Sequence, residues 1–181
     1  KTFAELGAHV DAVDPGFADP RDAWLTLWYS GAAKILGHLT ADERKRLDPG
    51  LRVHVERGEK ISAVDFLVAD AARTDLGRHM QLFHQRYDLL LCPSVAVPAL
   101  KVGTDLSDPA HQKEWIDWTP FSYPFNLTRQ PAASVPCGLT SDGLPIGLQI
   151  VGPLYADALV LRAMRAFETT YPAPRPPLAA E

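Results

Sequence analysis

The segment from Trp118 to Gly152, WTPFSYPFNLTRQPAASVPCGLTSDGLPIGLQIVG, carries the clearest structural signal in the sequence. Two apolar runs, 133–138 and 146–151, flank Ser141-Asp142-Gly143, and an Asp-Gly pair between two such runs is typical of a hairpin turn. Pro136 has no amide hydrogen to donate, which predicts a bulge or a ladder gap beside it. The sequence therefore predicts an antiparallel hairpin whose two strands are both substantially buried.

Helices and further strands are predicted on both sides of this hairpin. Four helices are expected from capping residues followed by apolar residues at helical spacing. Their expected ranges are 19–37, 40–48, 62–86 and 157–171. Strands are expected at 87–92, which is continuously apolar after Asp88, and at 10–13. This pattern predicts an α/β fold over 1–181, a mixed β-sheet covered by helices, with a proline-rich tail at 170–181.

Bulk composition excludes several classes of protein. Hydrophobic residues make up 46% of the chain and charged residues 22%, as in folded globular proteins. A net charge of −4 gives no electrostatic reason to expect direct nucleic-acid binding. No apolar run approaches the roughly 20 residues that cross a bilayer, so no membrane segment is expected. The two cysteines, Cys92 and Cys137, lie in separate apolar runs, which favours reduced thiols and a cytoplasmic protein.

Self-contained catalytic and metal-binding motifs are absent from the sequence. It contains no G-x-S-x-G elbow, no phosphate-binding glycine loop and no dinucleotide fingerprint. His79 and His84 are five residues apart on a predicted helix, so their side chains diverge by about 140° and do not share a metal. Cys137 has no evident partner histidine and is interpreted as a core thiol. Neither a metal nor a cofactor is expected.

The segment 93–132 is too long to serve only as a connection between two elements, and it carries a cluster of aromatic residues. The cluster consists of Trp115, Trp118, Phe121, Tyr123 and Phe125. Large rings on a loop suit the wall of a small-molecule pocket, but they also suit the filling between a loop and a sheet. Asn126 is expected to brace the loop by bonding backbone groups.

The same segment resembles the C-terminal signature of the amidase signature family, serine hydrolases that use a Ser–cisSer–Lys triad. Further likenesses fall in family order at 13–17, 47–51, 61–63 and 87–94, so the resemblance covers nearly the whole chain. It implies that the chain is the C-terminal portion of a larger amidase domain. The family places its lysine and both serines in the N-terminal half, within a Gly/Ser-rich loop. This chain contains neither Gly-Gly nor Ser-Ser, so no catalytic residue is assigned to it.

By this resemblance, the chain shapes the pocket for a small amide substrate. The expected substrate-binding residues are Trp118, Thr119, Phe121 and Tyr123. The expected partner is the N-terminal half of the same enzyme, and the chain alone is expected to be inactive. A half-domain also exposes apolar surface that association covers, so a homodimer is a further expected form. The sequence departs from the family at Arg129, where glycine is usual; if the position needs a positive φ, arginine costs on the order of 1 kcal/mol.

Three functions stay open at this point. The first is hydrolysis of carboxamide C–N bonds through an acyl-enzyme. The second is that of the A subunit of a glutamine-dependent tRNA amidotransferase, in which an aspartate grips the amino group of glutamine. Thr119 stands at that position here, which removes the charge that would pair with an ammonium. The third is a non-catalytic assembly module.

Overall fold

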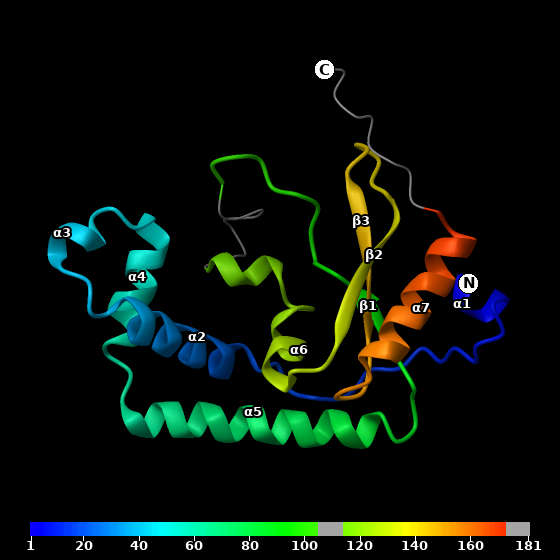
Figure 1. Ribbon diagram of the computed structural model, residues 1–181, viewed down its shortest axis with the longest axis horizontal. Helices are drawn as coiled ribbons and strands as arrows, with labels where there is room; N and C mark the ends of the chain where they lie inside the picture. Colours follow the sequence, from blue (N-terminus) through cyan, green and yellow to red (C-terminus); the bar gives the residue numbers. More distant parts are fainter. Residues whose placement is uncertain (105–113, 173–181) are drawn as a thin grey trace. The chain divides into compact units, whose positions relative to one another are not determined.

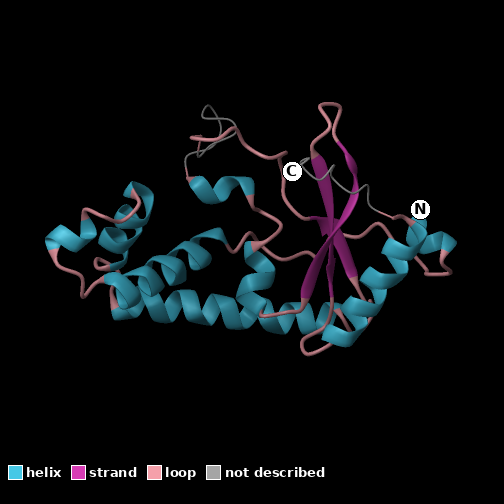
Figure 2. Cartoon of the chain, turned by 45° about the horizontal axis from the view of Figure 1, so that its top comes forward, coloured by secondary structure: helices cyan, strands magenta, loops and turns pink. Residues whose placement is uncertain are grey.

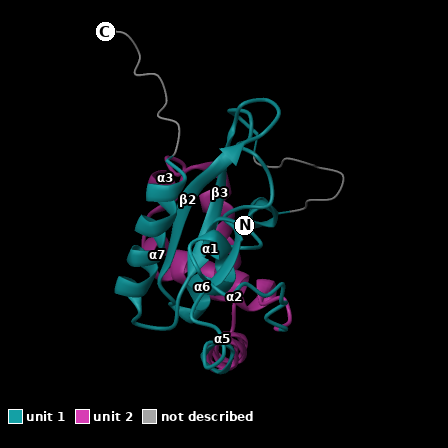
Figure 3. Ribbon diagram, turned by 90° about the vertical axis from the view of Figure 1, so that its right-hand side faces the viewer, with its two compact units in different colours: residues 1–16, 80–181 teal, residues 17–79 magenta. Residues whose placement is uncertain are grey.

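The structure, a computed structural model, describes residues 1–104 and 114–172 and divides into two units (Figure 3). Unit 1 comprises Lys1–Gly16 and Met80–Glu181, and unit 2 comprises Phe17–His79. The elements in chain order are α1 (Thr2–Glu5), α2 (Arg21–Leu36), α3 (Ala41–Arg44), α4 (Pro49–Gly58), α5 (Ala63–Phe83), β1 (Leu90–Pro93), the 3-10 helix η1 (Trp115–Trp118), α6 (Tyr123–Thr128), β2 (Ala132–Leu139), β3 (Pro145–Val151) and α7 (Asp157–Thr170).

A three-stranded sheet in the order β1-β3-β2 forms the centre of unit 1 (Figure 2). β2 and β3 pair antiparallel, which confirms the predicted hairpin, and Gly143 in its turn has a φ of +80°. The register shifts between Pro136 and Gly138, as the missing amide hydrogen of Pro136 predicted. Burial is uneven along the hairpin, because Val135 and Ile150 are fully buried while residues near the turn are exposed.

Every strand pairing within the described ranges is antiparallel, where the sequence predicted a mixed sheet. The continuous apolar run at 87–92 is typical of a parallel strand, because such strands are covered on both faces. In the structure this run supplies β1, which is an antiparallel neighbour of β3 and is buried or half-buried from Leu90 to Cys92. The strand begins at Leu90, three residues later than expected.

Helix α7 covers one face of the sheet, as Figure 1 shows. Its buried residues Val160, Ala163 and Phe167 pack with Val135 and Ile150 in one apolar cluster. The other face carries the alternate residues of the strands and lies against the segment that contains η1 and α6, whose Phe121 carbonyl is bonded from β3. α1 lies beside α7, where the rings of Phe3 and Phe167 stack with centroids 5.7 Å apart.

Unit 2 is built on the packing of α2 against α4. Val55 of α4 is fully buried, and the Arg57 guanidinium donates to the Tyr29 hydroxyl of α2 at 2.8 Å. Gly58 makes the close approach possible, because a Cβ at this position would overlap the Tyr29 carbonyl. The first part of α5 completes the unit, with residues 63–79 assigned to it.

Two of the four predicted helix starts are confirmed by their caps. Thr40 and Glu43 form the reciprocal capping box of α3, and Ser62 and Asp65 exchange the same bonds at the start of α5. α7 matches its predicted range closely. α2 begins at Arg21 rather than at proline, since the Asp19 carboxylate accepts from the Arg21 amide at 3.0 Å.

Other expectations from the sequence are wrong. Asp48-Pro49 starts α4 instead of only ending the previous helix, because the Asp48 carboxylate accepts from the amides of Gly50 and Leu51. Residues 10–13 form no strand; they are exposed, and the strands of the described ranges pair with one another instead. The expected loop 93–132 contains η1 and α6.

The predicted tail at 170–181 lies outside the described residues from position 173 onward. None of the helices in the described ranges combines the length and the apolar character that crossing a bilayer requires.

Candidate functional site

Residues 114–128 form a succession of tight turns along the sheet face opposite α7. The Glu114 amide donates to the Asp117 carboxylate at 3.0 Å, which caps η1. The Thr119 amide then donates to the Ile116 carbonyl, and the Ser122 amide to the Thr119 carbonyl. α6 follows directly, with Asn126 Nδ2 donating to the Ser122 carbonyl at 3.1 Å. Asn126 thus braces its own backbone, as the sequence predicted.

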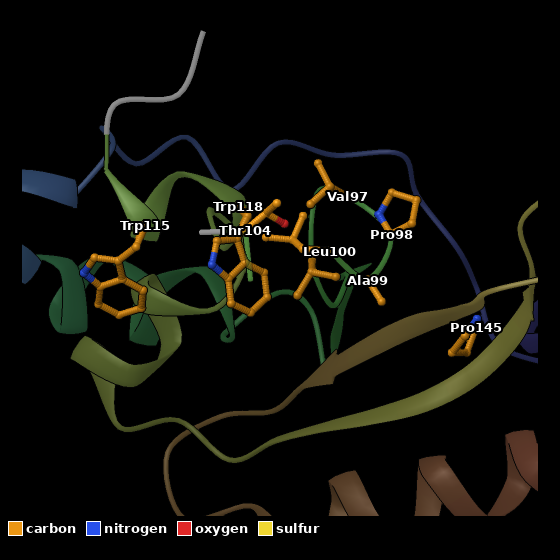
Figure 4. A pocket seen from close by; sticks show the side chains of 9 residues that line it. Val97, Pro98, Ala99, Leu100, Thr104, Trp115, Trp118 and Pro145 are labelled. Atoms are coloured by element: carbon orange, nitrogen blue, oxygen red, sulfur yellow. The ribbon is translucent and has the colours of Figure 1, made fainter. Parts of the chain in front are cut away.

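A pocket of about 560 Å³ opens between this segment and the chain that follows β1. Figure 4 shows two indole rings contributed by η1, the 97–100 run that faces them, and Pro145 at the outer end of β3. The lining residues are Val95, Val97, Pro98, Ala99, Leu100, Thr104, Trp115, Trp118 and Pro145. The lining side chains are apolar except for the indole N–H groups and the Thr104 hydroxyl, which donates to the Lys101 carbonyl at 2.6 Å. The pocket therefore suits an apolar group.

Hydrogen bonds join the segment 114–122 to the sheet and to the chain after β1. The Ala96 amide donates to the Trp118 carbonyl at 3.2 Å. The Ser122 hydroxyl donates to the Ser94 carbonyl at 3.1 Å. From β3, Gln149 Nε2 donates to the Phe121 carbonyl at 2.7 Å. These bonds hold the indole wall at a fixed distance from the opposite wall.

The four residues expected to bind substrate lie in different environments in the structure. Trp118 lines the pocket. Thr119 is only 7% exposed, and its hydroxyl donates to the Ile116 carbonyl at 3.0 Å. Tyr123 is 4% exposed at the start of α6, and Phe121 is half-buried and contributes its carbonyl to the bond from Gln149. Trp118 alone of the four lines the pocket; contact with substrate stays a prediction for all of them.

The sequence did not indicate the wall formed by residues 95–100. These residues follow β1 directly and lie in the long segment that was expected to be functional. A usable signal was the pair of prolines, Pro93 and Pro98, around a short apolar run, which is typical of an extended chain over a surface. Pro145, which directly precedes the second predicted strand, lies at the edge of the pocket.

Burial favours the neutral form of two cysteine thiols and one histidine in unit 1. Burial raises the pKa of the Cys92 thiol, against which the hydrogen bond from Gln149 acts in the opposite direction. Burial also raises the pKa of Cys137, and both cysteines are free and half-buried. For His84, burial lowers the pKa, while its Nδ1 bonds the Tyr87 carbonyl at 2.9 Å. Within 1–104 and 114–172, no three His, Cys, Asp or Glu side chains are grouped so that they could hold a metal ion.

Comparison with known proteins decides the family. The sequence profile described as Amidase matches residues 17–161. The chain belongs to the amidase signature family. It is 33% identical over 176 residues to an acylamidase of Rhodococcus erythropolis, an alignment that covers 94% of this chain and 37% of that relative.

Two further members of the amidase signature family illustrate the range of similarity. A solved bacterial aryl acylamidase superposes with a TM-score of 0.76 at 29% identity, covering 95% of this chain and 38% of that one. The A subunit of the glutamyl-tRNA(Gln) amidotransferase of Geobacillus kaustophilus (strain HTA426) is 38% identical over 102 residues, which is 55% of this chain and 20% of that relative. The chain thus spans less than two fifths of the length of the curated relatives that it matches.

Proposed function

We propose that this chain is the pocket-forming C-terminal part of an amidase that hydrolyses carboxamides bearing an apolar or aryl group. The observation that carries the proposal is the apolar pocket between Trp115 and Trp118 on one side and the 95–100 run on the other. Its volume of about 560 Å³ is in the range of small-molecule sites. Burial of a substrate's apolar group there contributes roughly 0.8 kcal/mol per CH₂.

The chemical step is assigned to the portion of the enzyme outside this chain. By resemblance to the family, a serine attacks the amide carbonyl, and its proton passes through a cis-serine toward a neutral lysine. Backbone amides stabilise the oxyanion, the C–N bond breaks, and the amine leaves with a proton. Water then hydrolyses the acyl-enzyme. The role of this chain is to hold the substrate so that its amide meets that serine.

A glutamine-dependent amidotransferase is the second candidate, because relatives of that name match more than half of the chain. Gripping the ammonium of glutamine calls for a carboxylate, and the position expected to supply it is Thr119. Its hydroxyl donates inside the segment to the Ile116 carbonyl, and the side chain is buried. This arrangement supports a neutral amide as substrate in preference to glutamine.

The test is an assay of residues 1–181 alone and after mixing with the separately expressed N-terminal portion of the enzyme. An arylamide, an aliphatic amide and glutamine form the substrate panel. We expect no turnover by 1–181 alone, turnover on mixing, and a higher kcat/KM for the arylamide than for glutamine.

Three other results would contradict the proposed function. Preference for glutamine would promote the amidotransferase. Binding of the two portions without turnover of any amide would favour the non-catalytic assembly module. Turnover by 1–181 alone would show that a catalytic site lies within this chain.

A further inference from the structure

Gln149 is a buried polar side chain at the centre of the sheet. It is 8% exposed, and its neighbours across the ladder are Cys92 on β1 and Ser134 on β2. A buried amide that lacks hydrogen-bond partners costs about 1–3 kcal/mol, so such a group is kept only where its bonds are made. The hydrogen bonds of Gln149 therefore indicate the structural role of this residue.

Both contacts made by Gln149 Nε2 join structural parts that are distant in sequence. The nitrogen donates to the Phe121 carbonyl at 2.7 Å and to Cys92 Sγ at 3.2 Å. The first bond leaves the sheet and ends on the turn between η1 and α6. The second runs to the neighbouring strand and fixes the plane of the side-chain amide.

The bond to Phe121 differs from the other two attachments of the pocket wall. Those two attach Trp118 and Ser122 to the Ser94–Ala96 stretch, which adjoins the opposite wall. They join the indole wall to the chain that leads into the opposite wall. The bond from Gln149 instead starts on the middle strand of the sheet, which also pairs with β1, the strand from which the opposite wall extends. It therefore fixes the distance of the indole wall from the sheet that carries both walls.

We infer that Gln149 is a positioning residue that sets the width of the apolar pocket, and with it the size of the aryl or alkyl group that the enzyme accepts. This inference rests on the proposed function and adds a residue that determines specificity. Gln149 acts through the Phe121 carbonyl and the turn that carries Trp118. It does not need to touch the substrate.

The first test replaces Gln149 by methionine, which has a similar length and no amide, in the complete enzyme. KM and kcat are measured for amides with aryl groups of increasing size. We expect KM for the best-fitting aryl amide to rise about tenfold, the effect of losing one buried hydrogen bond, with kcat unchanged and the size preference broadened.

Gln130→Met is the matched control. Gln130 is also buried, at 9% exposure, and its Nε2 donates to a backbone carbonyl, that of Gly152, at 2.9 Å. The bond joins the start of β2 to the end of β3 and does not involve residues 114–122. We expect both variants to lower the melting temperature, whereas only Gln149→Met should raise KM.

Gln149→Glu gives a readout that a purely structural role would not change. A protonated carboxyl donates to the Phe121 carbonyl, whereas a carboxylate repels it, so KM should rise as the pH increases through the pKa of the new group. The titratable group that faces this position among the described residues is the Cys92 thiol, which burial keeps protonated. The wild type should lack this pH dependence of KM.

A measurement independent of turnover separates this inference from the proposed function. Fluorescence of Trp118, assigned by subtraction of a Trp118→Phe variant, should shift to longer wavelength in Gln149→Met and stay unchanged in Gln130→Met. If the wild type hydrolyses no amide, the proposed function fails and the fluorescence decides the inference alone. Unchanged fluorescence, or KM values that change equally in both glutamine variants, would overturn the role of Gln149.

Discussion

Ser94 at the end of β1 and Ser134 on β2 join their hydroxyl groups at 2.6 Å across the middle strand of the sheet. Between them on β3 is Gly147, where a Cβ would lie 2.6 Å from Ser94 Oγ and 2.8 Å from Ser134 Oγ. The contact between the two outer strands therefore depends on the absence of a side chain at Gly147. The Ser94 amide also donates to the Gly147 carbonyl at 2.9 Å, which holds Ser94 beside this glycine.

Gly147→Ala should destabilise the protein by about 1–3 kcal/mol, because the added methyl group displaces both hydroxyls. Urea unfolding measures the change. Gly31→Ala is the control: apart from its chain neighbours and the backbone of its own helix, no atom lies within 4 Å of a Cβ at this position in α2, so the substitution should stabilise by about 0.5–1 kcal/mol. A stable Gly147→Ala variant would mean that the serines rotate away without loss.

Arg129→Gly should stabilise the protein by about 1 kcal/mol, because arginine occupies a left-handed backbone conformation there. Arg129 ends α6 with a φ of +58° and a ψ of +25°. Gly143→Val is the opposite substitution at a second positive φ, +80°, and should cost more than about 1 kcal/mol. Both are measured as differences in unfolding free energy; a loss of stability in Arg129→Gly would indicate that the arginine side chain contributes contacts that outweigh its backbone strain.

Trp118 and Tyr123 should respond differently to truncation. Tyr123 is buried at the start of α6, so Tyr123→Ala should cost about 3–5 kcal/mol of stability, as for other large core side chains. Trp118 lines the pocket, so Trp118→Ala should change the ranking of amide substrates by kcat/KM more than it changes stability. Equal losses of stability in the two variants would assign both rings to the core.

The capping box of α5 should make stability depend on pH. The hydrogen bond from the Ser62 hydroxyl, followed by that from the Ser62 amide, lowers the pKa of Asp65 in the folded state. The corresponding stabilisation is present above the ordinary carboxyl pKa and is lost as the pH falls through the lowered folded value. In Ser62→Ala the melting temperature should therefore fall less steeply on acidification than in the wild type, and identical slopes would rule out this contribution.

Features with a local cause could be predicted from the sequence. The Ser62–Asp65 cap, the Asp142-Gly143 turn and the bulge beside Pro136 each follow from one or two residues. α4 was missed because Asp-Pro at a helix start uses the same residues as a chain break, and only the amides that Asp48 bonds distinguish the two. A local pattern can mislead in the same way at 10–13, where a short apolar run stays exposed and unpaired with the described sheet.

Only one of the two walls of the candidate pocket could be predicted from the sequence. Trp118 and its aromatic neighbours stand out in the sequence, but the opposite wall consists of ordinary aliphatic residues such as Val97 and Leu100. These residues become a wall because the Ala96 amide bonds the Trp118 carbonyl, a pairing that no local pattern encodes. Gln149 is likewise inconspicuous in a strand until its partner, the Phe121 carbonyl, is known.

The stacking of Phe3 on Phe167 has a consequence for the order of events during synthesis on the ribosome. Unit 1 is discontinuous, because the chain leaves it after Gly16 and returns at Met80. Unit 2 is therefore translated as one continuous stretch and can acquire its α2–α4 packing early. α1, although it emerges before the rest of unit 1, has to wait for α7 before its partner exists. α1 can dock on α7, and so complete unit 1, only after Phe167 has been translated.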